Sequence, residues 1–274
     1  MSLEVLAYDA APPPPDLPRG DIRTHADFHS RVLDNRRTVL VYLPPGYDAA
    51  PERRYPVLYL HDGQNLFDGA TAYIYGQDWR VGQTAQALIE AGAIEPLVIV
   101  GVYNMGHGRV DEYTPSYDRG RNMGGRADAY GRMLVEELKP FVDANYRTRT
   151  EASATGLGGS SLGGLVTLYL GLRRPQTFTR LAALSPSVFW GGRQIIREVE
   201  QLQGRPPLRI WLDTGTAEGW YVTEHARALR DALVIRGWTH GHDLHYLEAH
   251  GAEHNELAWA ARVAPMLKFL FPRV

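Results

Sequence analysis

Short apolar runs alternate with longer amphipathic stretches along most of the chain. Residues 57–60 and 96–103 are compact apolar runs, which are typical of strands buried on both faces of a sheet. Residues 127–146 instead carry apolar side chains at helical spacing. By the same criteria we expect further strands at 154–159, 181–184, 208–213 and 243–247, and further helices at 81–93, 162–172, 221–235 and 257–271.

The order of these elements predicts the fold class. Strands and helices alternate from about residue 55 onward, which indicates an α/β fold with a mostly parallel central sheet and helices on both faces. Residues 28–33 and 38–43 are strand-like runs around Asp34-Asn35, so we expect an antiparallel N-terminal edge. Residues 104–125 lack either pattern and are expected to form a long loop of the kind that is usually functional.

A proline-rich stretch precedes the patterned part of the chain. Residues 11–18 read A-P-P-P-P-D-L-P, which favours an extended polyproline arm. We expect residues 1–24 to form this arm and residues 25–274 to form a single domain, a size that open α/β sheets often reach as one unit. No basic segment precedes an apolar core in residues 1–20, so no signal peptide is visible and a cytoplasmic location is expected.

The composition excludes several classes of function. The formal net charge is −2, from 29 basic and 31 acidic residues, which leaves no strong field to recruit nucleic acid or an anionic membrane. No apolar run approaches the roughly 18 residues that span a bilayer. The chain has no cysteine, which excludes disulfides, thiolate metal sites and a cysteine nucleophile. Covalent catalysis would therefore use a hydroxyl, carboxylate, amine or imidazole.

One segment fits the pattern of a catalytic serine. Gly159-Ser160-Ser161-Leu162-Gly163 matches G-x-S-x-G, with a small-residue strand expected before it and an apolar helix after it. In that context the serine occupies a sharp strand-to-helix turn that exposes its hydroxyl. The following N–H, that of Leu162, would lie at the helix N-terminus and could stabilise an oxyanion. The alternative is a glycine-rich turn that a serine caps.

A serine nucleophile needs a base, and five histidines lie near the end of the chain. We favour His254, just before the last expected helix, over His250 in the same loop. His245 lies within an expected strand, where a position on the face of the sheet is the simpler interpretation. His240 and His242 are spaced to share a strand face, but no carboxylate stands at metalloenzyme spacing. We therefore expect neither a metal nor another cofactor.

The base in turn needs a carboxylate to orient it, and the oxyanion needs a second donor. Asp213 ends an expected strand and Glu218 lies five residues later, so the residues alone leave both open as the acid. The second donor should come from the loop after the first buried strand, H-D-G-Q-N-L-F-D. There Gly63 permits a tight turn that directs the Gln64 N–H toward the pocket, although an ordinary turn would look the same.

Several motifs, in this order, resemble the putative esterase family of α/β-hydrolases. That family includes enterobactin-type siderophore esterases, feruloyl and acetyl-xylan esterases, S-formylglutathione hydrolases and mycolyltransferases. The motifs are Y-L-H-D-G-Q-N-L-F-D (59–68), D-E-Y-T-P (111–115), V-E-E-L-K-P-F-V-D-A-N-Y-R (135–147), G-G-S-S-L-G-G-L (158–165), L-S-P-S-V-F-W (184–190), D-T-G-T-A-E-G (213–219) and E-H-N-E-L-A-W (253–259).

The resemblance implies an α/β-hydrolase fold and a serine carboxylic-ester hydrolase that acts through an acyl-enzyme, with Ser161 as nucleophile. In related members the acid follows a G-T-x-[DE] turn, which matches Glu218 here. The family histidine precedes a short segment ending in tryptophan, which matches His254 and Trp259. The second oxyanion amide of the family falls two residues after an aspartate, which matches Gln64. An acyltransferase or a catalytically silent binding module on the same fold stays possible.

The resemblance is weaker for the substrate, for which a small, siderophore-type or acyl-sugar ester is expected. Arg109, Glu112 and Tyr113 lie in the expected long loop and are candidates for binding it. Trp190 lies beside an expected strand end, where an aromatic ring can stack on a ligand, although core packing is equally compatible. No nucleic-acid or membrane partner is expected, and the sequence leaves the oligomeric state open.

Overall fold

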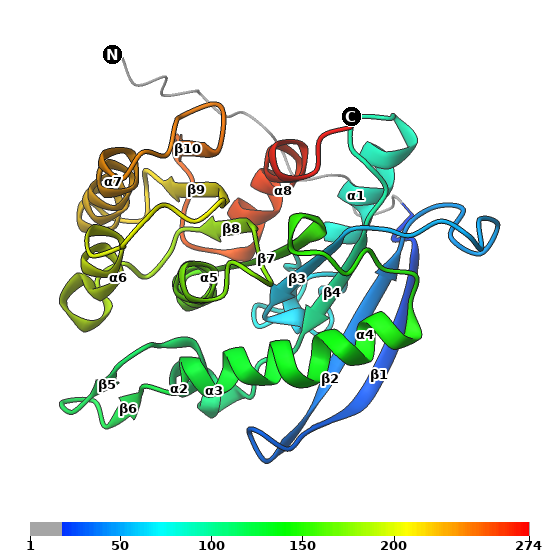
Figure 1. The fold of residues 1–274 in the computed structure, drawn as a ribbon, viewed down its shortest axis with the longest axis horizontal. Coiled ribbons are helices and arrows are strands. Elements are labelled where there is room, and N and C mark those ends of the chain that lie inside the picture. The colour runs from blue at the N-terminus through cyan, green and yellow to red at the C-terminus, as the bar shows by residue number, and fades with distance from the viewer. Residues whose placement is uncertain (1–17, 274) are drawn as a thin grey trace.

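The computed structural model describes residues 18–273 and contains an eight-stranded sheet (Figure 1). Its strands are β1 (Asp21–Ser30), β2 (Asn35–Leu43), β3 (Val57–His61), β4 (Val98–Val102), β7 (Thr155–Ser160), β8 (Arg180–Leu184), β9 (Arg209–Gly215) and β10 (Leu244–Ala249). The spatial order is β1-β2-β4-β3-β7-β8-β9-β10. Pairs β1–β2 and β2–β4 are antiparallel, and every other neighbouring pair is parallel. The expected mostly parallel sheet with an antiparallel edge is thus confirmed.

Helices cover both faces of this sheet and bury two separate apolar cores, because the central strands have no solvated face. One core packs under α1 and α8, which lie on the same side of the sheet in Figure 1. The other core packs under α3 to α7. The helices are α1 (Val81–Glu90), α3 (Ala127–Arg132), the π-helical η3 (Met133–Leu138), α4 (Lys139–Asn145), α5 (Leu162–Arg173), α6 (Trp190–Glu200), α7 (Trp220–Ile235) and α8 (Glu256–Leu270).

The antiparallel edge begins earlier than the sequence indicated. Strand β1 starts at Asp21, so the last four residues of the expected arm already belong to the sheet. Most of that arm lies outside the described residues. Strand β1 reads D-I-R-T-H-A-D-F-H-S and is largely exposed, so it shows no apolar signal. Charged side chains on an edge strand also hinder pairing with other chains.

Two segments carry more regular structure than expected. Residues 104–125 are not a plain loop, because they form the short helices η2 (Gly106–Gly108) and α2 (Arg109–Tyr113) and a ribbon of β5 (Tyr117–Asp118) and β6 (Met123–Gly124). Helix α6 was not expected at all. Its first turn contains Gly191 and Gly192 in left-handed conformation, which conceals the helical pattern that follows.

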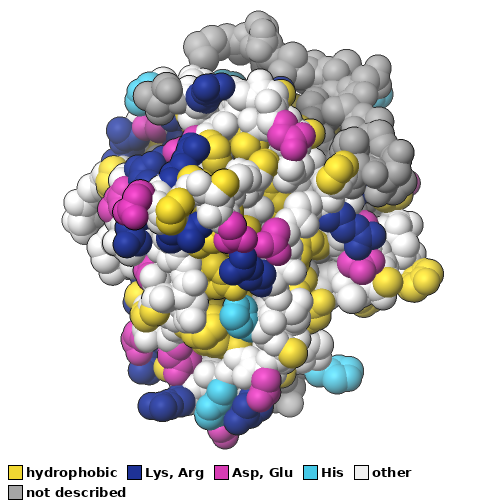
Figure 2. All heavy atoms as spheres, turned by 90° about the vertical axis from the view of Figure 1, so that its right-hand side faces the viewer, with side chains coloured by type: hydrophobic (Ala, Val, Ile, Leu, Met, Phe, Trp, Pro, Cys, Tyr) yellow, Lys and Arg dark blue, Asp and Glu magenta, His cyan; other side chains and the backbone are white. Residues whose placement is uncertain are grey.

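The surface agrees with the near-neutral composition. On the face shown in Figure 2, acidic and basic side chains are interspersed, and no extended area of one sign is visible. Within residues 18–273, no helix combines the length and the apolar character that a bilayer span requires.

Candidate active site

Ser161 occupies a strained turn between β7 and α5. Its backbone angles are φ 58° and ψ −121°, a region that residues with a side chain rarely adopt. Ser161 N–H donates to Leu184 O (3.0 Å), and Ser161 O accepts from Ser187 N–H (2.9 Å), so β8 and its following loop hold the turn. A Cβ at Gly159 would lie 3.0 Å from the His61 ring, which explains why this position is glycine. The turn therefore has the form that the sequence pattern predicts.

The two amides expected to serve an oxyanion both lie in the first turn of a helix. Leu162 is the first residue of α5, and Gln64 lies in the 3-10 helix η1 (Gly63–Asn65). First-turn N–H groups have no intrahelical acceptor and are free to bind an external one. The Gln64 side chain accepts a hydrogen bond from Asn104 N–H at 3.2 Å, which ties η1 to the segment after β4.

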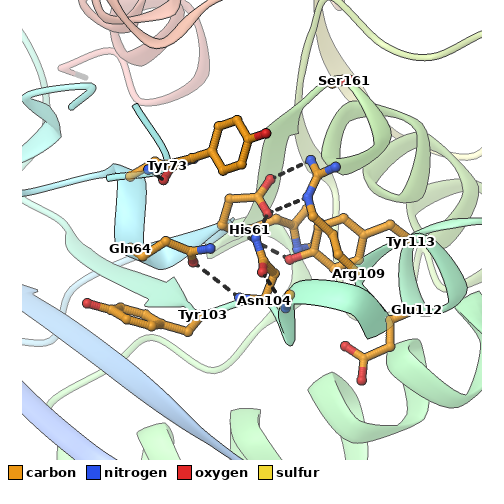
Figure 3. Close-up of polar contacts among 12 residues, drawn as sticks. His61, Gln64, Tyr73, Tyr103, Asn104, Arg109, Glu112, Tyr113 and Ser161 are labelled. Atoms are coloured by element: carbon orange, nitrogen blue, oxygen red, sulfur yellow. Dashed lines mark hydrogen bonds and ion pairs between the residues drawn. The ribbon is translucent and has the colours of Figure 1, made fainter. Parts of the chain in front are cut away.

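Asp62, directly before η1, is held from three directions in a left-handed conformation (φ 57°, ψ 46°). Arg109 donates to both of its carboxylate oxygens, at 2.7 and 2.8 Å, and Asn104 Nδ2 donates at 2.6 Å (Figure 3). Tyr113 accepts the Asp62 N–H at 3.3 Å. Burial alone would raise the pKa of Asp62, but Arg109 and Asn104 outweigh it and hold that pKa below its ordinary value. The side chain is thus an ionised clamp on the loop that carries Gln64.

His254 and Glu218 form a direct pair. Glu218 Oε2 lies 2.8 Å from His254 Nδ1, and the Glu218 side chain is fully buried, whereas 39% of the His254 side chain is exposed. The other Glu218 oxygen accepts hydrogen bonds from Gly215 N–H and Ser185 Oγ. The carboxylate is therefore fixed at one end and reaches the imidazole with the other, leaving His254 Nε2 available to a reacting group.

Asp213, the other candidate acid, faces a different set of partners. Its carboxylate accepts from Trp211 Nε1 (2.6 Å) and Ser185 N–H (3.1 Å), and lies 3.5 Å from Arg262 Nε. Burial raises the pKa of Asp213 to about 6, against the opposing effect of Arg262. Asp213 therefore helps to fix the segment beneath Glu218. The carboxylate that contacts His254 is that of Glu218.

Ser161 and His254 line one cavity of about 330 Å³ at the carboxyl ends of the strands. Their side chains do not share a hydrogen bond there, because Ser161 Oγ lies 3.3 Å from Ser187 Oγ and bonds to it instead. Hydrogen bonds between catalytic groups are often long without substrate and tighten in the complex. Other residues that line the cavity include Asp62, Asn65, Tyr73, Arg109, Glu256 and Trp259.

The candidates for substrate binding occupy different places. Arg109 lines the cavity, with 24% of its side chain exposed. Glu112 points away from it in Figure 3 and forms a buried ion pair with Arg37 at 2.8 Å. Tyr113 is fully buried against His61, and its hydroxyl binds the Asp62 loop rather than the cavity.

Trp190, the fourth candidate, is buried and donates to Ser116 O at 3.0 Å. It lines a separate hollow near the β5–β6 ribbon. Of the four candidates, Arg109 therefore lines the cavity beside Ser161, and the other three do not.

Some residues at the site were not singled out from the sequence. Ser187 lies in the motif L-S-P-S-V-F-W and contacts the Ser161 hydroxyl. Glu256 lies two residues after His254, and its buried carboxylate lines the cavity. Asp62 was visible only as part of the D-G turn. The sequence offered one indication of Glu256, namely its place two residues after the expected base, His254.

The histidines beside β10 show no metal-binding arrangement. His240 Nε2 accepts a hydrogen bond from Tyr246 N–H at 3.3 Å, and the His242 side chain is 83% exposed. His245 stacks on Trp211 with ring centroids 4.5 Å apart, as a side chain on the face of the sheet would. In the part of the chain that the structure describes, no three His, Asp or Glu side chains are grouped to hold a metal ion.

Comparison with known proteins gives one family. The family model described as "Putative esterase" matches residues 30–270. The chain is 26% identical over 264 residues to an endo-1,4-beta-xylanase/feruloyl esterase of Xylanibacter ruminicola, which covers 93% of this chain and 32% of that protein. It is 24% identical over 234 residues to the ferri-bacillibactin esterase BesA of Bacillus subtilis, which covers 75% of this chain and 76% of that protein.

A solved structure shows the same fold. The BES protein from Bacillus cereus superposes with a TM-score of 0.73 at 21% sequence identity, covering 91% of this chain and 94% of that one. The expected α/β-hydrolase fold is confirmed by this likeness. The chain spans about a third of the length of the xylanase relative.

Proposed function

The chain belongs to the putative esterase family, and on that premise we propose that it is a serine carboxylic-ester hydrolase working through an acyl-enzyme. One observation carries the proposal. Ser161, on a strained turn at a helix N-terminus, shares a cavity with His254, whose Nδ1 is held by the buried Glu218. A nucleophile, a base and an orienting acid in this relation are the parts that acyl transfer to serine requires.

In the proposed reaction, His254 Nε2 removes the Ser161 proton while Ser161 Oγ bonds to the ester carbonyl carbon. The carbonyl oxygen becomes an oxyanion, which the Leu162 and Gln64 N–H groups stabilise. Glu218 keeps the His254 proton on Nδ1 and stabilises the imidazolium. The bond from carbon to the alcohol oxygen then breaks, and His254 returns the proton to that oxygen. Water attacks the acyl-enzyme by the same route and releases the acid.

We propose a small-molecule ester as the substrate. A cavity of about 330 Å³ lies at the small end of the range typical of ligand sites, about 300–1,000 Å³. The names of two relatives, a feruloyl esterase and a ferri-bacillibactin esterase, support this choice, because each specifies the hydrolysis of an ester.

The first test is covalent labelling and loss of turnover at Ser161. Ser161→Ala should lower ester hydrolysis by at least about 10³-fold and abolish fluorophosphonate labelling, while the circular dichroism spectrum stays that of the folded protein. Mass spectrometry of the labelled wild type should place the adduct on Ser161. Release of free acid without an added acceptor alcohol would separate a hydrolase from an acyltransferase.

The second test uses two histidines of one loop as a matched pair. His254→Ala should reduce kcat about as strongly as Ser161→Ala, because the two act as a unit. His250→Ala removes an exposed imidazole four residues away and should leave kcat nearly unchanged. An active Ser161→Ala protein, or equal losses in both histidine variants, would refute the assignment.

A further inference from the structure

The cavity beside Ser161 contains more acidic than basic charge. Asp62 and Arg109 both line it, but the guanidinium donates to both oxygens of that carboxylate, so the pair is neutral as a unit. Glu256 lines the same cavity, and none of the ion pairs among the described residues includes it. Arg109 and His254 attract the Glu256 carboxylate from beyond ion-pair distance, so a substrate that enters next to Ser161 meets one carboxylate that forms no ion pair with a described residue.

The surroundings of Glu256 keep that carboxylate in place. The residue is 4% exposed and opens α8, where the positive end of the helix dipole favours an anion. Asn65 Nδ2 donates to Glu256 Oε1 at 3.3 Å. Asn65 is itself fixed, because its Oδ1 accepts the Tyr73 N–H at 2.9 Å. Asn65 Nδ2 and the backbone N–H of Glu256 itself donate to this carboxylate, which leaves acceptor capacity for a ligand.

A buried carboxylate with spare acceptor capacity discriminates between ligands by charge. It gains a strong hydrogen bond from a hydroxyl or ammonium group, and it repels an anion at short range in a partly desolvated site. On the premise of the proposed esterase function, we propose that Glu256 is a specificity-determining residue. It binds a hydrogen-bond donor of the ester, a hydroxyl or an ammonium group, and selects against esters that carry an anionic group at the same position.

Glu256 could instead act through His254, two residues earlier, by stabilising the imidazolium. That effect would be the same for every ester, because the base is common to all of them. Contact with the substrate would change the rates of different esters in opposite directions. A comparison of matched esters therefore separates the two roles.

The experiment uses two matched sets of esters: methyl benzoates with a 4-methyl, 4-hydroxymethyl, 4-aminomethyl or 4-carboxyl group, and phenyl acetates with the same four groups. The first set carries the group on the acid and the second on the alcohol, so the set that discriminates identifies the side that Glu256 contacts. Burial raises the pKa of Glu256, so kcat/KM is measured at about pH 8, well above the ordinary glutamate pKa of about 4.3.

In one of the two sets, wild type should prefer the hydroxymethyl and aminomethyl esters and hydrolyse the carboxyl ester most slowly. Glu256→Gln should raise kcat/KM for the carboxyl ester about tenfold relative to the methyl ester and lower it for the aminomethyl ester. Because glutamine still accepts hydrogen bonds, the hydroxymethyl ester should change least. A circular dichroism spectrum like that of wild type shows that the variant folds.

Glu253→Gln is the matched control, because it removes the same charge from an exposed position on the other side of His254. It should leave the preferences unchanged. Equal changes for all four esters in both sets, or the same shift in Glu253→Gln, would overturn the role of Glu256. Failure of the esterase proposal looks different, since wild type would then hydrolyse none of the esters or Ser161→Ala would hydrolyse them equally well.

Discussion

Asp62 and Asp213 are both buried aspartates beside an arginine at the carboxyl end of a parallel strand, yet they differ in what surrounds the pair. Asp62 accepts two hydrogen bonds from Arg109, which lines the cavity and has 24% of its side chain exposed. Asp213 lies 3.5 Å from Arg262, with both side chains fully buried. The first pair is therefore open to a substrate, and the second is sealed beneath the site.

The difference in contact sets the ionisation of the two carboxyls. Bonding to Arg109 and Asn104 overcomes burial and lowers the pKa of Asp62, whereas burial prevails at Asp213 and raises its pKa to about 6. Arg262 is also shared, since it lies 3.7 Å from Glu218 and donates to Ser185 Oγ at 2.9 Å. The short ion pair between Asp62 and Arg109 fixes the turn that carries Gln64. Arg262 instead lies near two carboxylates, those of Asp213 and Glu218, and so also stabilises the one that contacts His254.

The largest expected effect separates Glu218 from Asp213. Glu218→Gln should lower kcat by about 10³–10⁴-fold, because an amide cannot stabilise the imidazolium or fix its tautomer. Asp213→Asn keeps the shape of a side chain that does not touch His254, so kcat should fall by less than about tenfold. Steady-state kinetics on one ester measures both. A larger loss in Asp213→Asn than in Glu218→Gln would assign the acid to Asp213.

The next effect concerns stability and the sealed pair. Arg262→Leu leaves two buried carboxylates without their cation, so the free energy of unfolding should fall by about 3–5 kcal/mol. Arg109→Leu should cost less, because its site is partly solvated and its partner can be hydrated. Urea unfolding of both variants gives the comparison. Equal losses would show that burial does not distinguish the two pairs.

The sequence indicated the sheet and the turn that carries the proposed nucleophile, because both depend on local pattern. Strands buried on both faces appear as continuous apolar runs, and the turn at Ser161 needs small residues at fixed offsets. The first part of strand β1 and the whole of helix α6 were not predicted, the strand because its side chains are exposed and the helix because Gly191 and Gly192 interrupt its start. The pattern of apolar residues therefore indicates elements that are buried or periodic, and it does not indicate an element that is neither.

The partners of Ser161 depend on distant contacts, which pattern alone does not encode. The residues left Asp213 and Glu218 open, and the preference for Glu218 came from family resemblance. In the structure, the reversal after β9 brings the Glu218 carboxylate back to Gly215 N–H at 2.7 Å and so aims it at the imidazole. Glu112 shows the opposite case, because its charge suggested ligand binding while its partner, Arg37, lies 75 positions earlier in the chain.

A smaller effect tests the open pair as a positioning device. Asp62→Asn should lower kcat by about 100-fold with little change in KM, because a loosened turn misplaces the Gln64 N–H where charge develops only in the transition state. Arg109→Lys, which keeps one charged contact, should lose less. Affinity for a boronic-acid transition-state analogue should weaken in parallel with kcat. A rise in KM at unchanged kcat would instead make the pair a substrate-binding group.

The smallest effect is the pH dependence of the sealed pair. A carboxyl whose pKa is higher in the folded protein than in the unfolded chain favours folding at low pH, and this contribution declines as pH rises through the folded value of about 6. Between about pH 5 and pH 7, Asp213 should therefore remove about 1 kcal/mol from the free energy of unfolding. Asparagine does not titrate, so the stability of Asp213→Asn relative to wild type should rise by that amount over the same interval. Urea unfolding at several pH values measures it, and a difference that is constant or moves the other way would show that Arg262, rather than burial, controls this carboxyl.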